Sequence, residues 1–279
     1  MRVYLIGLSL LLSHFSATAE ERIISAGSVV TELIYALGAE QQLIAVDATS
    51  KHLLTGSNIP QVGYHRKLSS EGLLALNPSY LIGSDEMGPD TTLAQLRSSH
   101  VNVLVVPPGN SIEDLFHRID IIAELTGTTN KAVKLKQTVK QDIDNLNTSE
   151  LTRRPKVIFL MLKKGRPATV GGRETTVDKI IALSGATNPA SEAVRSYKPL
   201  SIESVVALQP DYILVSERAW SSLEGHDGIM TTFPLLAATP AGQPGKIVSI
   251  PSHALIGGFG IASIQLAQKL HDKFNQNEL

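Results

Sequence analysis

Short apolar runs, most of them rich in β-branched residues, alternate with amphipathic segments along the chain. The runs are RIISAG (22–27), QLIAVD (42–47), YLIGS (80–84), NVLVVP (102–107), KVIFLML (156–162), YILVS (212–216) and KIVSIP (246–251). Strands that alternate with helices in this way form parallel sheets covered by helices. The pattern therefore predicts an α/β fold.

One longer segment with helical periodicity, residues 128–151, separates the first four runs from the last three. Its apolar residues recur at spacings of three and four: Ala132, Leu135, Val139, Ile143 and Leu146. They predict an amphipathic helix of about 20 residues, about 30 Å long. A crossover helix inside a single sheet would show the same pattern. The position near the middle of the chain favours a single helix that connects two lobes, residues 20–127 and 152–279.

The two halves share a repeated segment. Residues 68–84 (LSSEGLLALNPSYLIGS) and 200–216 (LSIESVVALQPDYILVS) are identical at eight of 17 positions without a gap. Each copy has a Ser that can cap a helix, a Glu in the first turn, an apolar face and a Pro-containing turn before a strand. A weaker similarity between residues 31–39 and 177–186 could arise by convergence, but the stronger one indicates duplication. Two similar Rossmann-like lobes are expected to bind a ligand in the cleft between them.

The N-terminal segment MRVYLIGLSLLLSHFSATAEE has the features of a secretory signal peptide, with an early Arg2, a short apolar run and small residues before Glu20. We expect residues 1–19 to be removed near Ala19–Glu20 and the mature chain to be periplasmic. An uncleaved anchor is less favoured, because the apolar run has about half of the roughly 20 residues that a membrane span needs. The mature chain is not expected to span a membrane.

Composition narrows the chemistry further. The absence of Cys excludes disulfides, a thiol nucleophile, a thiolate metal site and a lipid-modified Cys. A formal net charge of −1 provides no basic field for a nucleic-acid backbone, and one Trp and six Phe offer few surfaces for base stacking. We therefore expect no nucleic-acid partner. With 43% hydrophobic residues, the chain is long enough for two hydrophobic cores.

These features together resemble a known family. The signal peptide, the two lobes, the single connecting helix and the LSxExLLxLxPD type of repeat are similar to the substrate-binding proteins of ABC importers for cobalamin, ferric siderophores and haem. The resemblance implies a monomer that carries its ligand to the membrane subunits, a permease dimer, of an inner-membrane importer. It also identifies Glu71 and Glu203, which occupy the same place in the two repeats, as the carboxylates that dock on that permease.

Within this family, the segment VGYHRKLSSEG (62–72) is similar to one in periplasmic haem-binding proteins. There a Tyr after Val-Gly coordinates haem iron, and an Arg two residues later supports it. The resemblance places the iron ligand at Tyr64 and the supporting cation at Arg66. It implies that the protein captures ferric haem, as haem b, and delivers it. A ferric siderophore or cobalamin is the alternative ligand.

Elementary chemistry is compatible with this assignment. Ferric iron is a hard acid and phenolate oxygen a hard ligand, and tyrosine ligation of haem is an established mode. Free Tyr has a pKa near 10, and a nearby guanidinium favours the phenolate. Arg66 would face the same side as Tyr64 in an extended segment, and His65 would then turn away to the pocket rim or to solvent. Without the family, a Gly-Tyr pair more often serves packing or a hydrogen bond.

The second half of the chain offers weaker candidates. Some haem-binding relatives carry a His in the loop after the first strand of this lobe, where the present chain has Lys163, Lys164 and Arg166. Lys164 is a candidate partner for a haem propionate, although such loop charges are often simply solvated. Arg173 follows two glycines that would let the backbone approach a ligand closely.

The glycine turn IGGFGIAS (256–263) adds Gly258 and Phe259 as candidate ligand contacts, because its amides could face an anion. Tight packing is an equal alternative for this turn.

Other classes of function find little support in the sequence. The other histidines of the mature chain have no paired spacing typical of a zinc site on one element: His52, His100, His117, His226, His253 and His271. The chain lacks Gly-x-Ser-x-Gly, His-Glu-x-x-His and P-loop motifs. Asp85 and Glu86 follow a strand and could serve acid-base chemistry, but charges at a helix start or a cleft rim are the simpler explanation. We therefore expect a binding protein, and an exported enzyme is the less favoured alternative.

Overall fold

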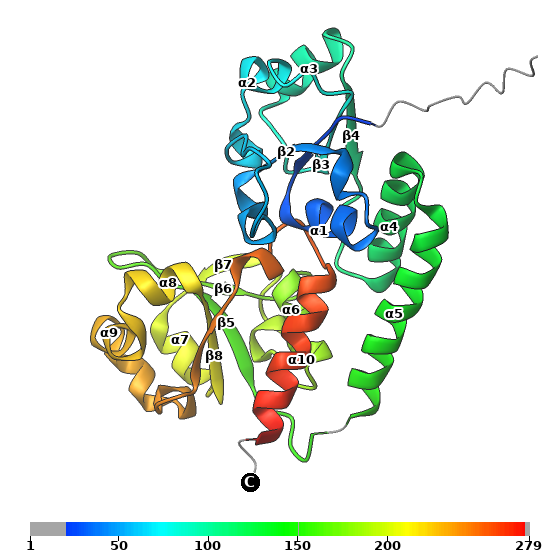
Figure 1. The fold of residues 1–279 in the computed structure, drawn as a ribbon. Coiled ribbons are helices and arrows are strands. Elements are labelled where there is room, and N and C mark those ends of the chain that lie inside the picture. Colours follow the sequence, from blue (N-terminus) through cyan, green and yellow to red (C-terminus); the bar gives the residue numbers. More distant parts are fainter. Residues whose placement is uncertain (1–20, 150, 277–279) are drawn as a thin grey trace, which may run out of the picture.

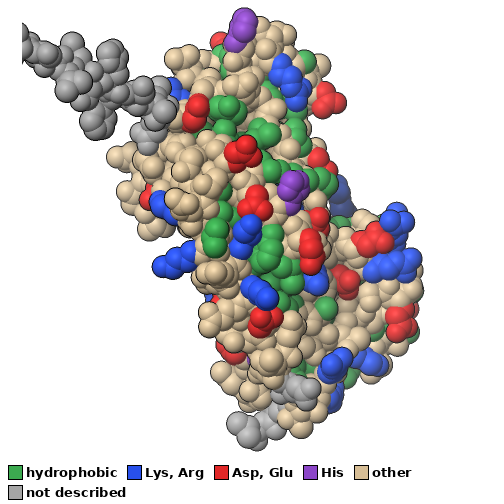
Figure 2. Space-filling model, turned by 90° about the vertical axis from the view of Figure 1, so that its right-hand side faces the viewer, with side chains coloured by type: hydrophobic (Ala, Val, Ile, Leu, Met, Phe, Trp, Pro, Cys, Tyr) green, Lys and Arg blue, Asp and Glu red, His purple; other side chains and the backbone are tan. Residues whose placement is uncertain are grey.

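The computed structural model describes residues 21–149 and 151–276 (Figure 1). The predicted signal peptide, residues 1–19, and its cleavage site at Ala19–Glu20 lie outside the described residues. Within the described part of the chain, no helix is both long and apolar enough to cross a bilayer. On the face shown in Figure 2, Lys and Arg side chains are interspersed with Asp and Glu, as a net charge near zero would suggest.

The first lobe is built on a four-stranded parallel sheet with the order β2-β1-β3-β4. Its strands are β1 (Ile23–Ala26), β2 (Leu43–Val46), β3 (Tyr80–Ser84) and β4 (Asn102–Val106). Its helices are α1 (Ser28–Ala36), α2 (Ser70–Leu74), α3 (Asp90–Ser98) and α4 (Ile112–Thr126). Neighbouring residues of β1 belong to opposite cores: Ile23 packs with α1 and α4, whereas Ile24 packs with α2 and α3. All four strands lie within the predicted runs.

The second lobe has a five-stranded sheet with the order β7-β6-β5-β8-β9. Its strands are β5 (Val157–Met161), β6 (Ala168–Gly171), β7 (Tyr197–Leu200), β8 (Tyr212–Ser216) and β9 (Ile247–Ile250). Strands β5, β8 and β9 are parallel, as predicted, but β6 is antiparallel to both β5 and β7. The sequence pattern missed β6 (ATVG) and β7 (YKPL) because neither has a continuous apolar run, and β7 is a polar edge strand that contains a Pro.

The helices of the second lobe are α6 (Thr176–Leu183), α7 (Ile202–Ala207), α8 (Glu217–Ser222), α9 (Gly225–Thr232) and α10 (Ile261–Gln276).

A single long helix, α5 (Thr129–Thr148), leads from the first sheet to the second and runs beside both lobes (Figure 1). The alternative of a crossover helix inside one sheet is therefore wrong. The buried residues of α5 share one apolar core with α1, α4, α6 and α10, so the two lobes are packed together along this helix. The division of the chain at residues 127/128 and 151/152 stays a proposal.

The two repeated segments fold in the same way. The Ser69 side chain accepts a hydrogen bond from the Gly72 amide at the start of α2, and Ser201 does the same for Ser204 at the start of α7. A residue with positive φ follows each helix, directly before a Pro: Asn77 in the first copy (49°) and Gln209 in the second (45°). Strands β3 and β8 then follow. This agreement supports duplication.

Candidate functional site

A cleft of about 680 Å³ lies between the lobes, within the range of small-molecule sites, roughly 300–1,000 Å³. The first lobe contributes Tyr64, Arg66, Asp85, Glu86 and the loop 108–110. The second contributes Phe159, Tyr197, Thr175 and the segment 255–258. The wall of the first lobe therefore carries three charged side chains, whereas that of the second is mainly apolar and hydroxyl-bearing with one carboxylate, Glu174.

Tyr64 directly precedes a tight turn of the chain. Gly63, with φ of 89°, turns the chain, Tyr64 itself is extended, and His65–Lys67 form a single 3-10 turn. The Tyr64 side chain lies on the cleft wall and is 42% exposed. Arg66 also lines the cleft, where it forms an ion pair with Glu86. The structure thus brings the two residues to one wall, although by a 3-10 turn instead of the extended segment that we expected.

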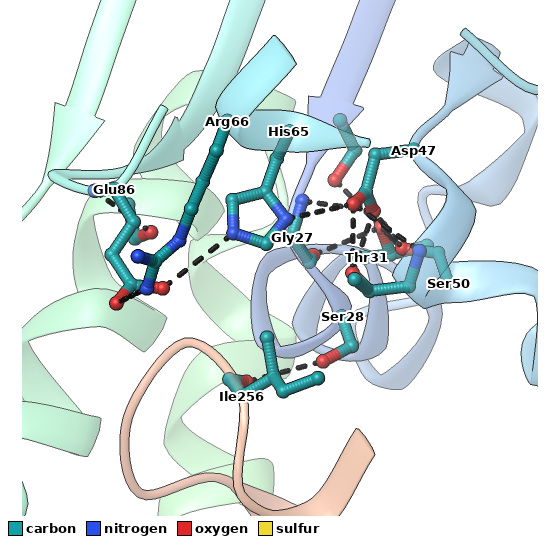
Figure 3. Close-up of polar contacts among 12 residues, drawn as sticks. Gly27, Ser28, Thr31, Asp47, Ser50, His65, Arg66, Glu86 and Ile256 are labelled. Atoms are coloured by element: carbon teal, nitrogen blue, oxygen red, sulfur yellow. Dashed lines mark hydrogen bonds and ion pairs between the residues drawn. The ribbon is translucent and has the colours of Figure 1, made fainter. Parts of the chain in front are cut away.

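The prediction that His65 lies at the pocket rim or in solvent is wrong. Its side chain is only 1% exposed, and it points into the first lobe, where Nδ1 lies 3.0 Å from Asp47 Oδ2 (Figure 3). The 3-10 turn is the reason, because alternation of side chains holds only in an extended chain. The ring centroids of His65 and Tyr64 are 4.4 Å apart, with planes inclined by 56°. His65 therefore contacts Tyr64 and not the cleft.

Asp47 is the partner that the sequence analysis missed. It directly follows β2, is fully buried, and accepts hydrogen bonds from the Gly27 amide (3.1 Å), the Thr49 hydroxyl (2.8 Å) and the Ser50 hydroxyl (2.9 Å). Burial would raise the pKa of this carboxyl, but the hydrogen bonds from His65, Thr49 and Ser50 together hold it below its usual value. The signal available in the sequence is an Asp-x-Thr-Ser segment directly after a strand.

Glu86 links the buried residues to the cleft. One carboxylate oxygen, Oε2, lies 3.5 Å from His65 Nε2, and the other, Oε1, binds Arg66 (Figure 3). The ion pair raises the pKa of Arg66 above its usual value. Glu86 was expected to be a rim charge, and the structure gives it the additional role of holding the Arg66 guanidinium.

Tyr197 provides a second phenol on the opposite wall. Its ring packs edge-on against Phe159, with centroids 6.4 Å apart. Burial raises the pKa of Tyr197 to about 12, so its phenol is protonated at neutral pH. The neighbouring Thr176 hydroxyl donates to the Asn110 side chain at 2.7 Å and joins the two lobes at the cleft. Tyr197 was not a predicted site residue because its strand, β7, was not predicted.

Three sequence candidates do not lie on the cleft. Lys164 is exposed in the turn between β5 and β6. The Arg173 guanidinium donates to the Ser191 and Glu192 carbonyls, and Arg173 is not among the residues that line the cleft. Phe259 is fully buried in the core. A charged residue type suggested Lys164, and neighbouring glycines suggested Arg173 and Phe259, but none of the three lines the cleft.

Gly258 does line the cleft. Its φ is 96°, and a Cβ there would lie only 2.8 Å from the Gly109 carbonyl oxygen of the other lobe. The glycine is therefore needed for close packing between the lobes, and a contact with ligand stays a prediction.

The segment 252–262, which forms part of the cleft wall, is held by the first lobe. Glu32 in α1 accepts from the amides of Ile261 (3.0 Å) and Ala262 (2.6 Å) at the start of α10. Arg118 in α4 is buried and donates to the Phe259 carbonyl. Burial, the largest effect, raises the pKa of Glu32 to about 7. These contacts tie the lobes together directly behind the cleft.

Glu71 and Glu203 lie outside the cleft. Each is exposed in the first turn of its short helix, α2 or α7. Neither forms an ion pair with any other described residue. The described residues also include no group of three or more His, Asp or Glu arranged to hold a metal ion.

Two α/β lobes joined by one long helix, with a cleft between them, define the fold of a two-lobe substrate-binding protein. The chain belongs to the periplasmic binding protein family, which it matches over residues 23–254.

Comparison with solved structures and curated sequences gives closer relatives. The chain is 52% identical to the periplasmic haem-binding protein HutB of Vibrio cholerae, with 91% of this chain and 99% of that chain covered and a TM-score of 0.85. It is 33% identical to the periplasmic haem-binding protein RhuT from Roseiflexus sp. RS-1, with 93% and 100% covered and a TM-score of 0.85. It is 27% identical to the vitamin B12-binding protein of Photorhabdus laumondii over 216 residues, 76% of this chain and 78% of the relative.

Proposed function

We propose that this protein binds ferric haem in the periplasm and delivers it to an inner-membrane ABC importer. The observation that carries the proposal is the half-exposed phenol of Tyr64 on the wall of a cleft of about 680 Å³, in a chain 52% identical to a haem-binding protein. Tyr64 would coordinate the iron through its phenol oxygen, and the Arg66 guanidinium lines the same wall of the cleft. Haem b is the cargo, and we propose that it leaves chemically unchanged.

Cobalamin is the second candidate, because the curated relatives are vitamin B12-binding proteins. Their identity to this chain, 27% or less, is about half of that to HutB. Binding of haemin and of cyanocobalamin to the same purified protein distinguishes the two ligands.

We also infer that the protein acts as a monomer and docks on the permease dimer through Glu71 and Glu203. Both carboxylates are exposed, both occupy the same position in a repeated helix, and neither lines the cleft. One charge on each lobe would suit a permease of two subunits.

The first prediction tests the iron ligand. Tyr64→Phe keeps the ring and removes the oxygen, so the haemin complex should lose its phenolate-to-iron charge-transfer band. Its affinity should fall by at least about tenfold, equivalent to about 1.4 kcal/mol. Absorption titration with haemin measures both quantities.

Tyr35→Phe, in α1 and outside the cleft lining, is the matched control and should behave like the unchanged protein. If Tyr64→Phe has an unchanged spectrum and affinity, Tyr64 is not the ligand. If the unchanged protein binds cyanocobalamin but not haemin, the cargo is a corrinoid.

A further inference from the structure

The turn that carries Tyr64 and Arg66 has one inward side chain. Tyr64 and Arg66 face the cleft, whereas His65 between them enters the first lobe and is almost completely buried. Backbone hydrogen bonds fix the rest of the turn, since the Lys67 amide donates to the Tyr64 carbonyl (2.7 Å) and the Gly88 amide to the His65 carbonyl (2.9 Å). The His65 side chain is therefore the internal anchor of a turn whose two neighbouring residues face the ligand space.

The partner of His65 determines which ring nitrogen carries the proton. Both oxygens of the ionised Asp47 carboxylate can only accept hydrogen bonds, so the Nδ1 atom 3.0 Å away must be the donor. The Asp47 carboxylate is itself immobilised by its bonds to the Gly27 amide and to the Thr49 and Ser50 hydroxyls. The ring of His65 is thereby fixed in both position and tautomer.

Two contacts connect this fixed ring to the cleft. The Tyr64 ring packs on it, with centroids 4.4 Å apart. On the other side, His65 Nε2 lies 3.5 Å from the Glu86 carboxylate that binds Arg66 (Figure 3). Among the described residues, His65 Nε2 has no hydrogen-bond partner. The ring therefore supports Tyr64 mainly by packing against it.

We propose that His65, anchored by Asp47, is the positioning residue that orients Tyr64 for coordination of haem iron. The inference rests on the proposed haem-binding function. Residues that orient a metal ligand from behind usually change metal affinity by about 10- to 100-fold when they are replaced. Loss of the His65 ring should therefore weaken iron coordination without removing the phenol.

His65→Asn gives the sharpest test. The Asn amide can still donate to Asp47 from nearly the position of Nδ1, but the ring that supports Tyr64 is gone. We expect the haemin complex of this variant to have a weaker or shifted phenolate-to-iron charge-transfer band and about tenfold lower affinity. Asp47→Asn leaves the ring in place with a weaker acceptor, and it should have a smaller effect in the same direction.

Two controls separate positioning from general stability. His117→Asn replaces an exposed His of α4 in the same lobe and should leave the spectrum unchanged. Leu96→Ala removes a fully buried side chain of α3, so it should lower the unfolding temperature while keeping the band at temperatures where the protein is folded. His65→Asn should lose the band at those same temperatures.

The possible outcomes decide the proposal. If the unchanged protein shows the band and His65→Asn retains both band and affinity, His65 does not position Tyr64. If Leu96→Ala loses the band as His65→Asn does, the effect is one of stability and the positioning role is wrong. If the unchanged protein shows no band with haemin, the proposed function fails, and the role of His65 fails with it.

Discussion

A pair of stacked imidazoles joins the lobes beside the cleft. The rings of His52, in the short 3-10 helix Ala48–Leu53, and His253, in the 3-10 turn Ser252–Ala254, have centroids 3.7 Å apart and planes inclined by only 11°. Burial is the largest effect on His253 and, with the charges of His52 and Lys269, lowers its pKa to about 4. Burial also lowers the pKa of His52, so the stack is uncharged at neutral pH, and protonation would place a cation in a partly buried contact between the lobes.

The pKa of His253 predicts that the protein loses stability in acid. Because the pKa in the folded protein lies below the ordinary 6.5, the unfolded chain takes up the proton first, and the free energy of unfolding falls as pH drops from about 6.5 toward 4. His253→Phe keeps an aromatic ring that cannot be protonated. With this variant, the fall in the free energy of unfolding should be smaller by about 1–2 kcal/mol. This figure takes into account that solvent screens the partly exposed ring.

Denaturant unfolding at pH 7.5 and at pH 5 measures the difference. His117→Phe, at an exposed position of α4, should keep the original pH dependence. An unchanged pH dependence in His253→Phe would contradict the assignment of the acid sensitivity to this stack.

The sequence predicted two residues of the cleft wall but not the directions of other side chains nearby. Tyr64 and Arg66 were recognised from a short motif, and the structure brings both to the cleft. His65 and Phe259 were misplaced because a 3-10 turn and a close crossing of the lobes at Gly258 decide where those side chains point. Such directions depend on backbone dihedral angles and on contacts between distant segments, which a local pattern does not contain.

At the scale of elements, helices α2 and α7 present one carboxylate each in the same structural setting. Each helix starts at a capping Ser and carries Glu71 or Glu203 in its first turn. A carboxylate there interacts favourably with the helix dipole, by about 0.3–1 kcal/mol, which would explain both residues without any partner. Their exposure and their equivalent positions on the two lobes are what a docking role requires.

The double change Glu71→Ala plus Glu203→Ala distinguishes docking from helix stabilisation. Loss of both dipole interactions should cost at most about 2 kcal/mol of stability, with an unchanged haemin spectrum because neither residue lines the cleft. Uptake by the reconstituted importer at limiting protein should fall by about tenfold or more, since docking charges contribute to encounter with the partner and to specificity.

Glu40→Ala plus Glu113→Ala changes two other Glu residues at helix starts, in the short 3-10 helix Glu40–Gln42 and in α4, and should leave uptake unchanged. Normal uptake with the Glu71 and Glu203 double variant would rule out the docking role.

Element prediction succeeded where periodicity was strong. Helix α5 spans 20 residues, as its apolar spacing indicated, and every predicted apolar run contains a strand. Strands β6 and β7 were missed because their residues, ATVG and YKPL, have no continuous apolar run. Their antiparallel pairing adds the wall that carries Tyr197, so the main gap in element prediction became a gap in the predicted site.

The whole molecule is held together by more than its connecting helix. The apolar core that surrounds α5 includes residues of both lobes. Directly behind the cleft, Glu32 binds the start of α10 and Arg118 binds the Phe259 carbonyl. Opening of the lobes would break these contacts and leave the buried guanidinium of Arg118 without the Phe259 carbonyl, which is costly for a buried charge. The structure therefore favours a cleft that exists before the ligand arrives.

The last prediction follows from this rigidity. A compact chain of this size has a radius of gyration of about 18 Å. Binding of haemin should change this radius by less than about 0.5 Å. Small-angle scattering of the protein with and without haemin measures the change. Arg118→Gln removes a tie between the lobes and should give a larger change on binding than the unchanged protein, which shows that the method detects movement of the lobes. Compaction of the unchanged protein by more than about 1 Å would mean that the lobes close as a hinge, despite α5 and the contacts behind the cleft.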